Sequence, residues 1–242
     1  MKHKSWQLDY EKRQNFNFIT TYLHNNRYKN LLNLFSTIKK KNNNKINVID
    51  IGCGVGKAYE LLNANYSINY YGIEANKGFY DIANKRYGDF ENFEIVCDSV
   101  ENQYDKFTDS DIVIGLETFE HIPENLVVRV IEAISKSNVP LFYCTVPNEV
   151  GPAILIKNLG SFIMGYSRHK EYSWKETISS SMYNLDNVGV HGVGHKGFDW
   201  RWLAQTIRHN LQIESITTSP FNFIPKSFAP SIGFIARSRK IK

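Results

Sequence analysis

The sequence contains no long hydrophobic run. No stretch approaches the roughly 18 apolar residues of a membrane-spanning helix, and no apolar segment follows the first residues as in a secretory signal peptide. Cysteine is also scarce, because Cys53, Cys97 and Cys144 are too few and too widely spaced for a disulfide framework or a zinc site. We therefore expect a cytoplasmic protein that works in a reducing compartment.

Neither sign of charge dominates the composition. The formal net charge of the 242 residues is +5, and part of the excess lies in Lys39–Lys41 and in the tail Arg237–Lys242. Such runs are most often solvated surface, with nucleic acid or an anionic membrane as the alternative partner. Because 42% of the residues are hydrophobic, we expect residues 1–242 to bury one core and form a single domain.

Three glycines at alternate positions, Gly52, Gly54 and Gly56, follow a short β-branched run at 48–51 and precede a helical pattern. This order predicts a strand, a tight turn and a helix, and it lets backbone amides approach a ligand closely. A dinucleotide fingerprint, G-x-G-x-x-G, would need its third glycine where Lys57 stands. A nicotinamide dehydrogenase is therefore disfavoured.

Polar residues follow further strand-like runs along the chain. Glu74 follows the run at 68–73, Asp98 and Ser99 follow 93–97, and Glu117 follows 110–116. Parallel strands bring their carboxyl ends to one edge of a sheet, where ligands of open α/β folds bind. We also expect a fifth strand at 140–148 and two closing strands at 211–217 and 231–237.

The glycine turn, the acid Asp50 two positions before it and the Leu-Glu-Thr-Phe-Glu-His-Ile sequence at 116–122 resemble class I S-adenosylmethionine (SAM) dependent methyltransferases. The likeness is to the type 11/12 group, which includes ubiquinone-pathway and glycan-biosynthesis O-methyltransferases. It implies an α/β, Rossmann-like, doubly wound sheet of seven strands, mostly parallel with the last strand antiparallel, and a helical cap insertion. It also implies SAM as cofactor and S-adenosylhomocysteine (SAH) as product.

The resemblance assigns a cofactor site to residues at the strand ends. Glu74 would bind the ribose hydroxyls, and Asp98 and Ser99 would contact the adenine. The implied cofactor-binding residues are Asp50, Gly52, Cys53, Gly54, Gly56, Glu74, Asp98, Ser99 and Glu117. His121 and His195 are the candidate catalytic bases, because an imidazole titrates near neutral pH, with a structural role as the alternative for each.

Two segments fall outside the resemblance. Residues 1–45 are predicted to form a helical leader, and residues 149–194 interrupt the alternation of strands and helices. Because a typical βα loop has about 2 to 6 residues, we expect this insertion to cap the substrate site. Its first part, 152–166, is apolar around most of a helix and could pack on the domain, pair with another subunit or lie on a bilayer surface.

A divalent metal is left open. Glu117, Glu120 and His121 resemble the metal-binding turn of ubiquinone-pathway and small-RNA 2′-O-methyltransferases, and His191 or His195 would have to complete such a site. The same letters also occur in metal-free relatives.

The acceptor is the least determined part of the function. We expect methyl transfer to an oxygen of a small-molecule or glycan/lipid-linked acceptor. The alternatives are an RNA 2′-O-methyltransferase and a non-catalytic SAM-binding module. The sequence has no Asn-Pro-Pro-Tyr or Asp-Pro-Pro-Tyr turn, which disfavours methylation of DNA adenine or of protein glutamine.

Overall fold

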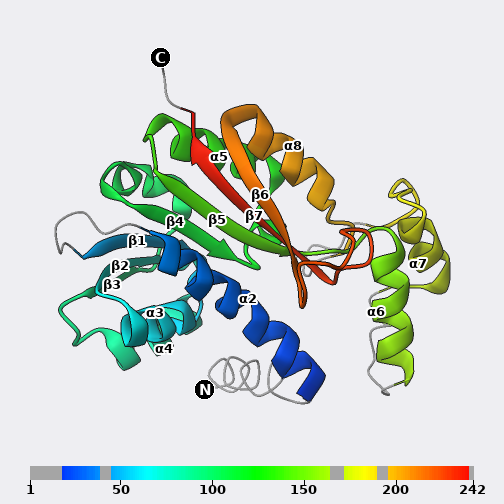
Figure 1. Cartoon of the computed structure of the whole chain (residues 1–242), viewed down its shortest axis with the longest axis horizontal. Helices are drawn as coiled ribbons and strands as arrows, with labels where there is room; N and C mark the ends of the chain where they lie inside the picture. The colour runs from blue at the N-terminus through cyan, green and yellow to red at the C-terminus, as the bar shows by residue number, and fades with distance from the viewer. Residues whose placement is uncertain (1–17, 39–44, 164–171, 190–195, 240–242) are drawn as a thin grey trace.

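A seven-stranded sheet forms the centre of the molecule (Figure 1). The computed structural model describes residues 18–38, 45–163, 172–189 and 196–239. The sheet has the order β3-β2-β1-β4-β5-β7-β6. Its strands are β1 (Ile46–Ile51), β2 (Ile68–Ile73), β3 (Phe93–Val96), β4 (Ile112–Leu116), β5 (Leu141–Pro147), β6 (Leu211–Ser219) and β7 (Ser231–Ser238).

The first five strands pair in parallel, and β7 runs antiparallel between β5 and β6. This confirms the predicted mostly parallel sheet with its last strand antiparallel. The order places β1 and β4 side by side, where the winding of the sheet changes direction. Ligands of such folds bind at the carboxyl ends of the strands around this point.

Helices cover both faces of the sheet (Figure 1). One face carries α2 (Phe18–Thr37), α3 (Lys57–Asn65) and α4 (Lys77–Tyr87). The other carries α5 (Glu124–Lys136) and α8 (Trp200–Asn210), with the short 3-10 helices η1 (Val100–Asn102), η2 (Tyr104–Asp109) and η3 (Phe119–His121). Because both faces are covered, every residue of β5 is buried.

Local sequence explains where several helices begin and which side they bury. The Asn76 side chain accepts hydrogen bonds from the amides of Gly78 and Phe79, so α4 starts there. Asp199 caps α8, because its side chain accepts a hydrogen bond from the Arg201 amide. In α5 the buried side chains are spaced by three and four residues, which forms one apolar stripe, and they are Val127, Val130, Ile131 and Ile134.

Two helices of the insertion stand beyond the carboxyl end of β5. They are α6 (Pro152–Ile163) and α7 (Trp174–Ser181), and Figure 1 shows them at one end of the molecule. A capping box at Ser173 and Glu176 fixes the start of α7. Among the described residues, no helix is both long and apolar enough to cross a membrane. Much of the predicted leader, residues 1–17, lies outside the described residues.

Candidate functional site

The glycine turn leads directly from β1 into α3. Gly52, Gly54 and Gly56 all have positive φ angles, of 69°, 57° and 80°. A Cβ atom added to Gly52 would lie 2.4 Å from Thr118 Cγ2, so the turn packs tightly against the end of β4. A Cβ added to Gly54 would meet no atom within 4 Å. Gly54 is therefore the part of the turn that a ligand can approach.

Glu74 joins the end of β2 to this turn. Its side chain is buried, with Oε2 accepting a 2.8 Å hydrogen bond from the Gly54 amide and Oε1 accepting a 2.7 Å bond from the Asn76 amide. Burial raises the pKa of the carboxyl group, and the two amide bonds oppose that shift. The sequence-predicted pair of glycine turn and acid is thus held in direct contact.

Asp50 and Cys53 lie beside the turn with their side chains in the interior. The Tyr70 hydroxyl donates a hydrogen bond to Asp50 Oδ2, and burial raises the pKa of Asp50 to about 7. The Cys53 thiol covers Gly72, where an added Cβ would lie 2.7 Å from Sγ. Burial also raises the pKa of this thiol, which keeps it protonated at neutral pH.

The predicted adenine-contacting residues follow β3. The Asp98 carboxylate accepts hydrogen bonds from the Ser99 amide at 2.7 Å, Asn102 Nδ2 at 2.8 Å and Gln103 Nε2 at 2.8 Å. The side-chain bonds from Asn102 and Gln103, followed by the Ser99 amide, lower the pKa of Asp98. Asp98 therefore orders the turn after β3, and Glu74 at the end of β2 donates its amide to Val96 next to it.

Glu117 follows the last residue of β4 and has a positive φ of 54°, which is uncommon for a residue with a side chain. Its amide donates to the Thr145 carbonyl at 2.8 Å, and its Oε1 accepts a 2.9 Å bond from the Ser231 hydroxyl on β7. The half-buried carboxylate thus links β4 to the start of β7. The four strand ends that the sequence predicted are brought to one edge.

Comparison with known proteins agrees with this arrangement. Residues 48–140 match the family model described as a methyltransferase domain. That segment contains the glycine turn, Glu74, Asp98 and Glu117. Residues 48–140 therefore form a methyltransferase domain, and the sheet around them has the fold of class I SAM-dependent methyltransferases.

Solved methyltransferases share the fold at low sequence identity. The methyltransferase domain of bacterial CtHen1 superposes with a TM-score of 0.60 at 15% identity, covering 89% of this chain and 99% of that one. A SAM-dependent methyltransferase from Clostridium acetobutylicum ATCC 824 gives 0.60 at 9% identity, covering 98% and 99%. Magnesium protoporphyrin IX methyltransferase from Synechocystis PCC 6803 with bound SAH gives 0.57 at 13%, covering 92% and 88%. No curated protein sequence matches this chain.

The structure describes only one of the two candidate catalytic bases of the methyltransferase. His121 lies in η3, just after the Glu117 turn, and its side chain is exposed. His195 lies outside the described residues, as does His191. Among the residues that the structure describes, no three His, Cys, Asp or Glu side chains are grouped to hold a metal ion. A metal completed by His191 or His195 remains an untested prediction.

Buried hydroxyl groups lie on β5 near the Glu117 turn. Tyr143 and Thr145 are almost fully buried, and within the described residues neither hydroxyl makes a hydrogen bond. They are two positions apart, so they share one face of the strand. Gly233 of β7 pairs with Thr145, and a Cβ added there would lie 3.5 Å from the Tyr143 hydroxyl. These polar groups lie near the carboxyl ends of β4 and β5, and sequence analysis did not single them out.

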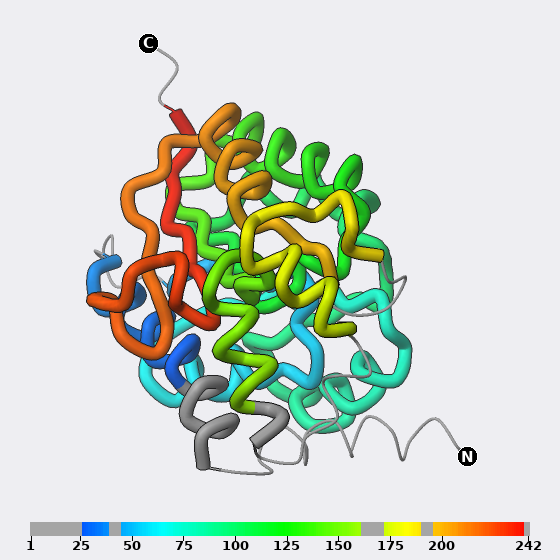
Figure 2. The backbone as a smooth tube through the Cα atoms, turned by 90° about the vertical axis from the view of Figure 1, so that its right-hand side faces the viewer, coloured from blue at the N-terminus to red at the C-terminus, as the bar shows by residue number. Residues whose placement is uncertain are grey.

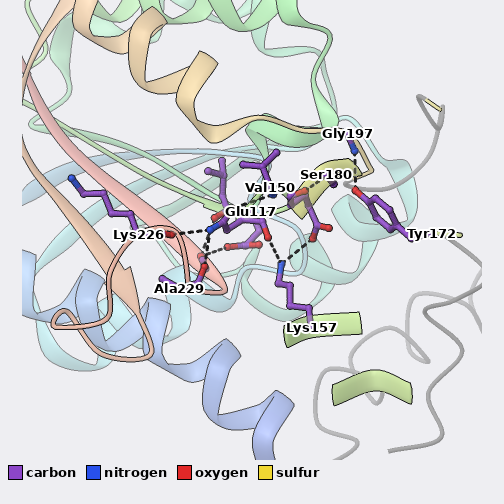
Figure 3. Close-up of polar contacts among 12 residues, drawn as sticks. Glu117, Val150, Lys157, Tyr172, Ser180, Gly197, Lys226 and Ala229 are labelled. Carbon is purple, nitrogen blue, oxygen red and sulfur yellow. Dashed lines mark hydrogen bonds and ion pairs between the residues drawn. The ribbon is translucent and has the colours of Figure 1, made fainter. Parts of the chain in front are cut away.

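A buried polar cluster fixes the cap of the methyltransferase to the end of β5 (Figure 3). Lys157 reaches from α6 to Glu149 Oε1 and to the Asn148 carbonyl, both at 2.9 Å. Asn148 Nδ2 donates to the carbonyls of Lys226 and Ala229, in the loop between β6 and β7. The Ser180 hydroxyl of α7 donates to the Glu149 carbonyl at 3.0 Å.

Sequence analysis did not single out Asn148, Glu149 and Lys157 as a cluster. The available signal was the presence of Glu149 and Lys157 as the only charged residues in the largely apolar segment from β5 through α6. Charged residues are almost never fully buried unless they are paired. An acid and a base eight positions apart across a loop could therefore have been read as a buried pair.

Proposed function

We propose that this methyltransferase transfers the methyl group of SAM to an oxygen of a small-molecule or glycan/lipid-linked acceptor. SAM supplies an electrophilic methyl group on its sulfonium centre. The acceptor oxygen forms the new O–C bond as the S–C bond breaks, the acceptor proton passes to a base, and SAH leaves. The protein holds the acceptor in line and takes up the proton.

The carboxylate of Glu74 beside Gly54 carries the cofactor half of this proposal. A ribose placed over the open side of Gly54 would meet a carboxylate that two backbone amides hold in position. An ionised carboxylate binds a pair of hydroxyls more strongly than a neutral acceptor does. Asp98 and Ser99, one strand further out, are proposed to face the adenine. The backbone of the turn, from Gly52 to Gly56, is proposed to lie under the rest of the cofactor.

Polar groups on the other side of the cofactor edge support an oxygen acceptor. The hydroxyls of Tyr143 and Thr145 are buried and make no hydrogen bond within the described residues, and we propose that they and the Glu117 carboxylate hydrogen-bond a polar acceptor. A buried hydroxyl without a partner is costly unless a ligand or water satisfies it. His121 is the proposed base within the described residues, because it follows the Glu117 turn in η3. His195 stays a candidate from the sequence.

The cofactor half is tested by calorimetric titration with SAH. Glu74→Gln removes the charge and keeps the shape, and we expect its dissociation constant for SAH to rise by about tenfold to a hundredfold. Glu94→Gln is the matched control, because Glu94 is an exposed acid on the neighbouring strand β3. Equal affinities for Glu74→Gln and wild type would contradict the proposed ribose contact.

The acceptor half is tested by transfer of a labelled methyl group from SAM to separated pools of small molecules, extracted glycolipids and RNA. Label in the small-molecule, glycan or lipid pool would support the proposal if hydrolysis releases it as methanol from a methyl ester or leaves it on the acceptor as a methyl ether. Label in RNA would move the assignment to the 2′-O-methyltransferase alternative. SAH binding with no labelled acceptor in any pool would favour a SAM-binding module.

A further inference from the structure

Three separate segments expose large apolar side chains at the cap end of the molecule. We call this set the cap surface, and it consists of Leu155, Ile156 and Leu159 on α6, Trp174, Ile178 and Met182 on and just after α7, and Phe221, Phe223 and Phe228 in the loop between β6 and β7. Figure 2 shows the loop, α6 and α7 next to one another on the face toward the viewer. The surface is therefore assembled by the fold from distant parts of the chain.

The exposed apolar side chains belong to segments that hydrogen bonds hold in place on the domain. Trp174, Ile178 and Met182 are spaced by four residues, so they form one stripe along α7. The opposite side of α7 is tied to α6 by a 2.7 Å hydrogen bond from Asn158 to Thr177. Because this hydrogen bond holds α7 against α6, the stripe of Trp174, Ile178 and Met182 remains on the outer side of the helix.

The loop between β6 and β7 is anchored in the same way. The Ala153 amide donates to the Ser227 carbonyl at 2.9 Å, and the Asn148 side chain donates to the Lys226 carbonyl. The rings of Phe221 and Phe223 stack with centroids 5.3 Å apart, and 83% of Phe223 is exposed. These two stacked aromatic rings expose apolar surface to water, and contact with an apolar partner surface would bury it.

The charges on the three segments are mostly basic, and their one acid is paired. Neither α6 nor the loop at 220–230 contains an acidic residue, and Lys226 and Lys175 are exposed. The one acid of α7, Glu176, is bonded to Lys196 at 2.7 Å, to the Gly189 amide and to Ser173. The cap surface therefore presents exposed apolar side chains with two exposed lysines, Lys175 and Lys226, beside them.

We propose that the cap surface docks on an anionic phospholipid bilayer. Aromatic and aliphatic side chains would enter the interface, and Lys175 and Lys226 would meet the headgroup phosphates. Charge complementarity selects this occupant, because the exposed lysines Lys175 and Lys226 beside the apolar side chains match the phosphates of an anionic headgroup layer. Docking in this way would bring the cap and the carboxyl edge of β5 to the lipid surface. The inference concerns the surface alone and does not depend on which acceptor is methylated.

The test is co-sedimentation of the full chain with vesicles of phosphatidylcholine alone or mixed with phosphatidylglycerol. We expect the wild type to bind the anionic vesicles more tightly than the neutral ones, with affinity falling as salt rises. Phe223→Ser combined with Ile156→Ser should weaken binding at least about tenfold, because both apolar groups leave the interface. Phe90→Ser is the matched control, since Phe90 is half exposed between α4 and β3, outside the cap surface.

SAH titration of each variant checks that the fold is intact, and Lys175→Glu combined with Lys226→Glu tests the charge separately. We expect this second variant to lose the preference for anionic vesicles while binding SAH normally. Wild-type protein that stays in solution with anionic vesicles would overturn the proposal. So would self-association that the Phe223→Ser and Ile156→Ser changes abolish while vesicle binding is unaffected, since the surface would then join protein chains.

Discussion

At the scale of single residues, the glycine turn rests beside a buried carboxyl group. Asp50 is almost fully buried, and the nearby charge of Glu74 adds to the desolvation that raises its pKa, while the Tyr70 hydrogen bond and the charge of Arg27 oppose it. A neutral carboxyl group can keep the bond with Tyr70 without the cost of a buried charge. The protonation state of Asp50 therefore makes the free energy of unfolding depend on pH.

This predicts a pH dependence with a definite sign. The pKa of Asp50 is about 7 in the folded protein against an ordinary value of 3.8, so the folded state binds the proton more tightly than the unfolded chain. The free energy of unfolding should therefore fall as pH rises between about 4 and 7. Asp50→Asn keeps an acceptor for Tyr70 and should raise the free energy of unfolding above pH 7 by about 1 to 4 kcal/mol, with little gain near pH 4.

Urea denaturation across this pH range measures the effect. Asp111→Asn is the control variant, because Asp111 is an exposed acid that directly precedes β4. A variant curve parallel to that of the wild type at all pH values would show that Asp50 stays ionised in the folded protein.

At the scale of elements, the turn between β1 and α3 divides its glycines between folding and binding. Gly54→Ala meets no neighbour, so its cost to folding should be limited to the positive φ, about 1 kcal/mol. Its methyl group would stand where we place the cofactor, and SAH affinity should fall at least about tenfold. Gly52→Ala has a similar φ but places its Cβ against Thr118, so it should mainly lower the free energy of unfolding.

Thermal unfolding and SAH titration of the two variants separate these effects. Adding Thr118→Ala should restore part of the stability of Gly52→Ala, because it removes the atoms closest to the added methyl group. Normal SAH affinity in Gly54→Ala would place the cofactor away from this turn.

At the scale of the whole molecule, one ion pair connects the cap to the sheet. The Lys157 ammonium is largely buried and the Glu149 side chain is almost completely buried, with 2.9 Å between Nζ and Oε1. Removing one partner would leave a buried charge, so Lys157→Met should lower the free energy of unfolding by roughly 3 kcal/mol or more. Lys157→Met combined with Glu149→Gln should be more stable than Lys157→Met alone, because the buried carboxylate that Lys157 balances is then replaced by a neutral amide.

Urea denaturation, with limited proteolysis to report opening of the cap, distinguishes these variants. Lys136→Met serves as the control, since the Lys136–Glu132 pair on α5 is exposed and its two charged atoms are 3.9 Å apart. If Lys157→Met is as stable as Lys136→Met, the pair does not hold the cap.

Much of the arrangement at the carboxyl ends of the strands could be predicted, because the sequence features that indicate it are local. Alternation of apolar residues marks each strand, and the residue after the strand then falls at a known edge of a parallel sheet, as for Glu74, Asp98 and Glu117. Positive φ angles at Gly52, Gly54 and Gly56 follow from residue type. The contacts that position Glu117 and Asp50 were outside this reach, because Ser231 lies 114 residues from Glu117 and Tyr70 lies on another strand.

The sequence by itself determined the alternation of strands and helices, the glycine turn and the acids at the strand ends, because these depend on neighbouring residues and on backbone preference. Only the tertiary structure decided the pKa of Asp50, the buried pair of Lys157 and Glu149 and the assembly of the cap surface. Each of these depends on how much water the folded chain removes from a group and on which distant residues it brings close, and neither quantity is encoded in any one segment.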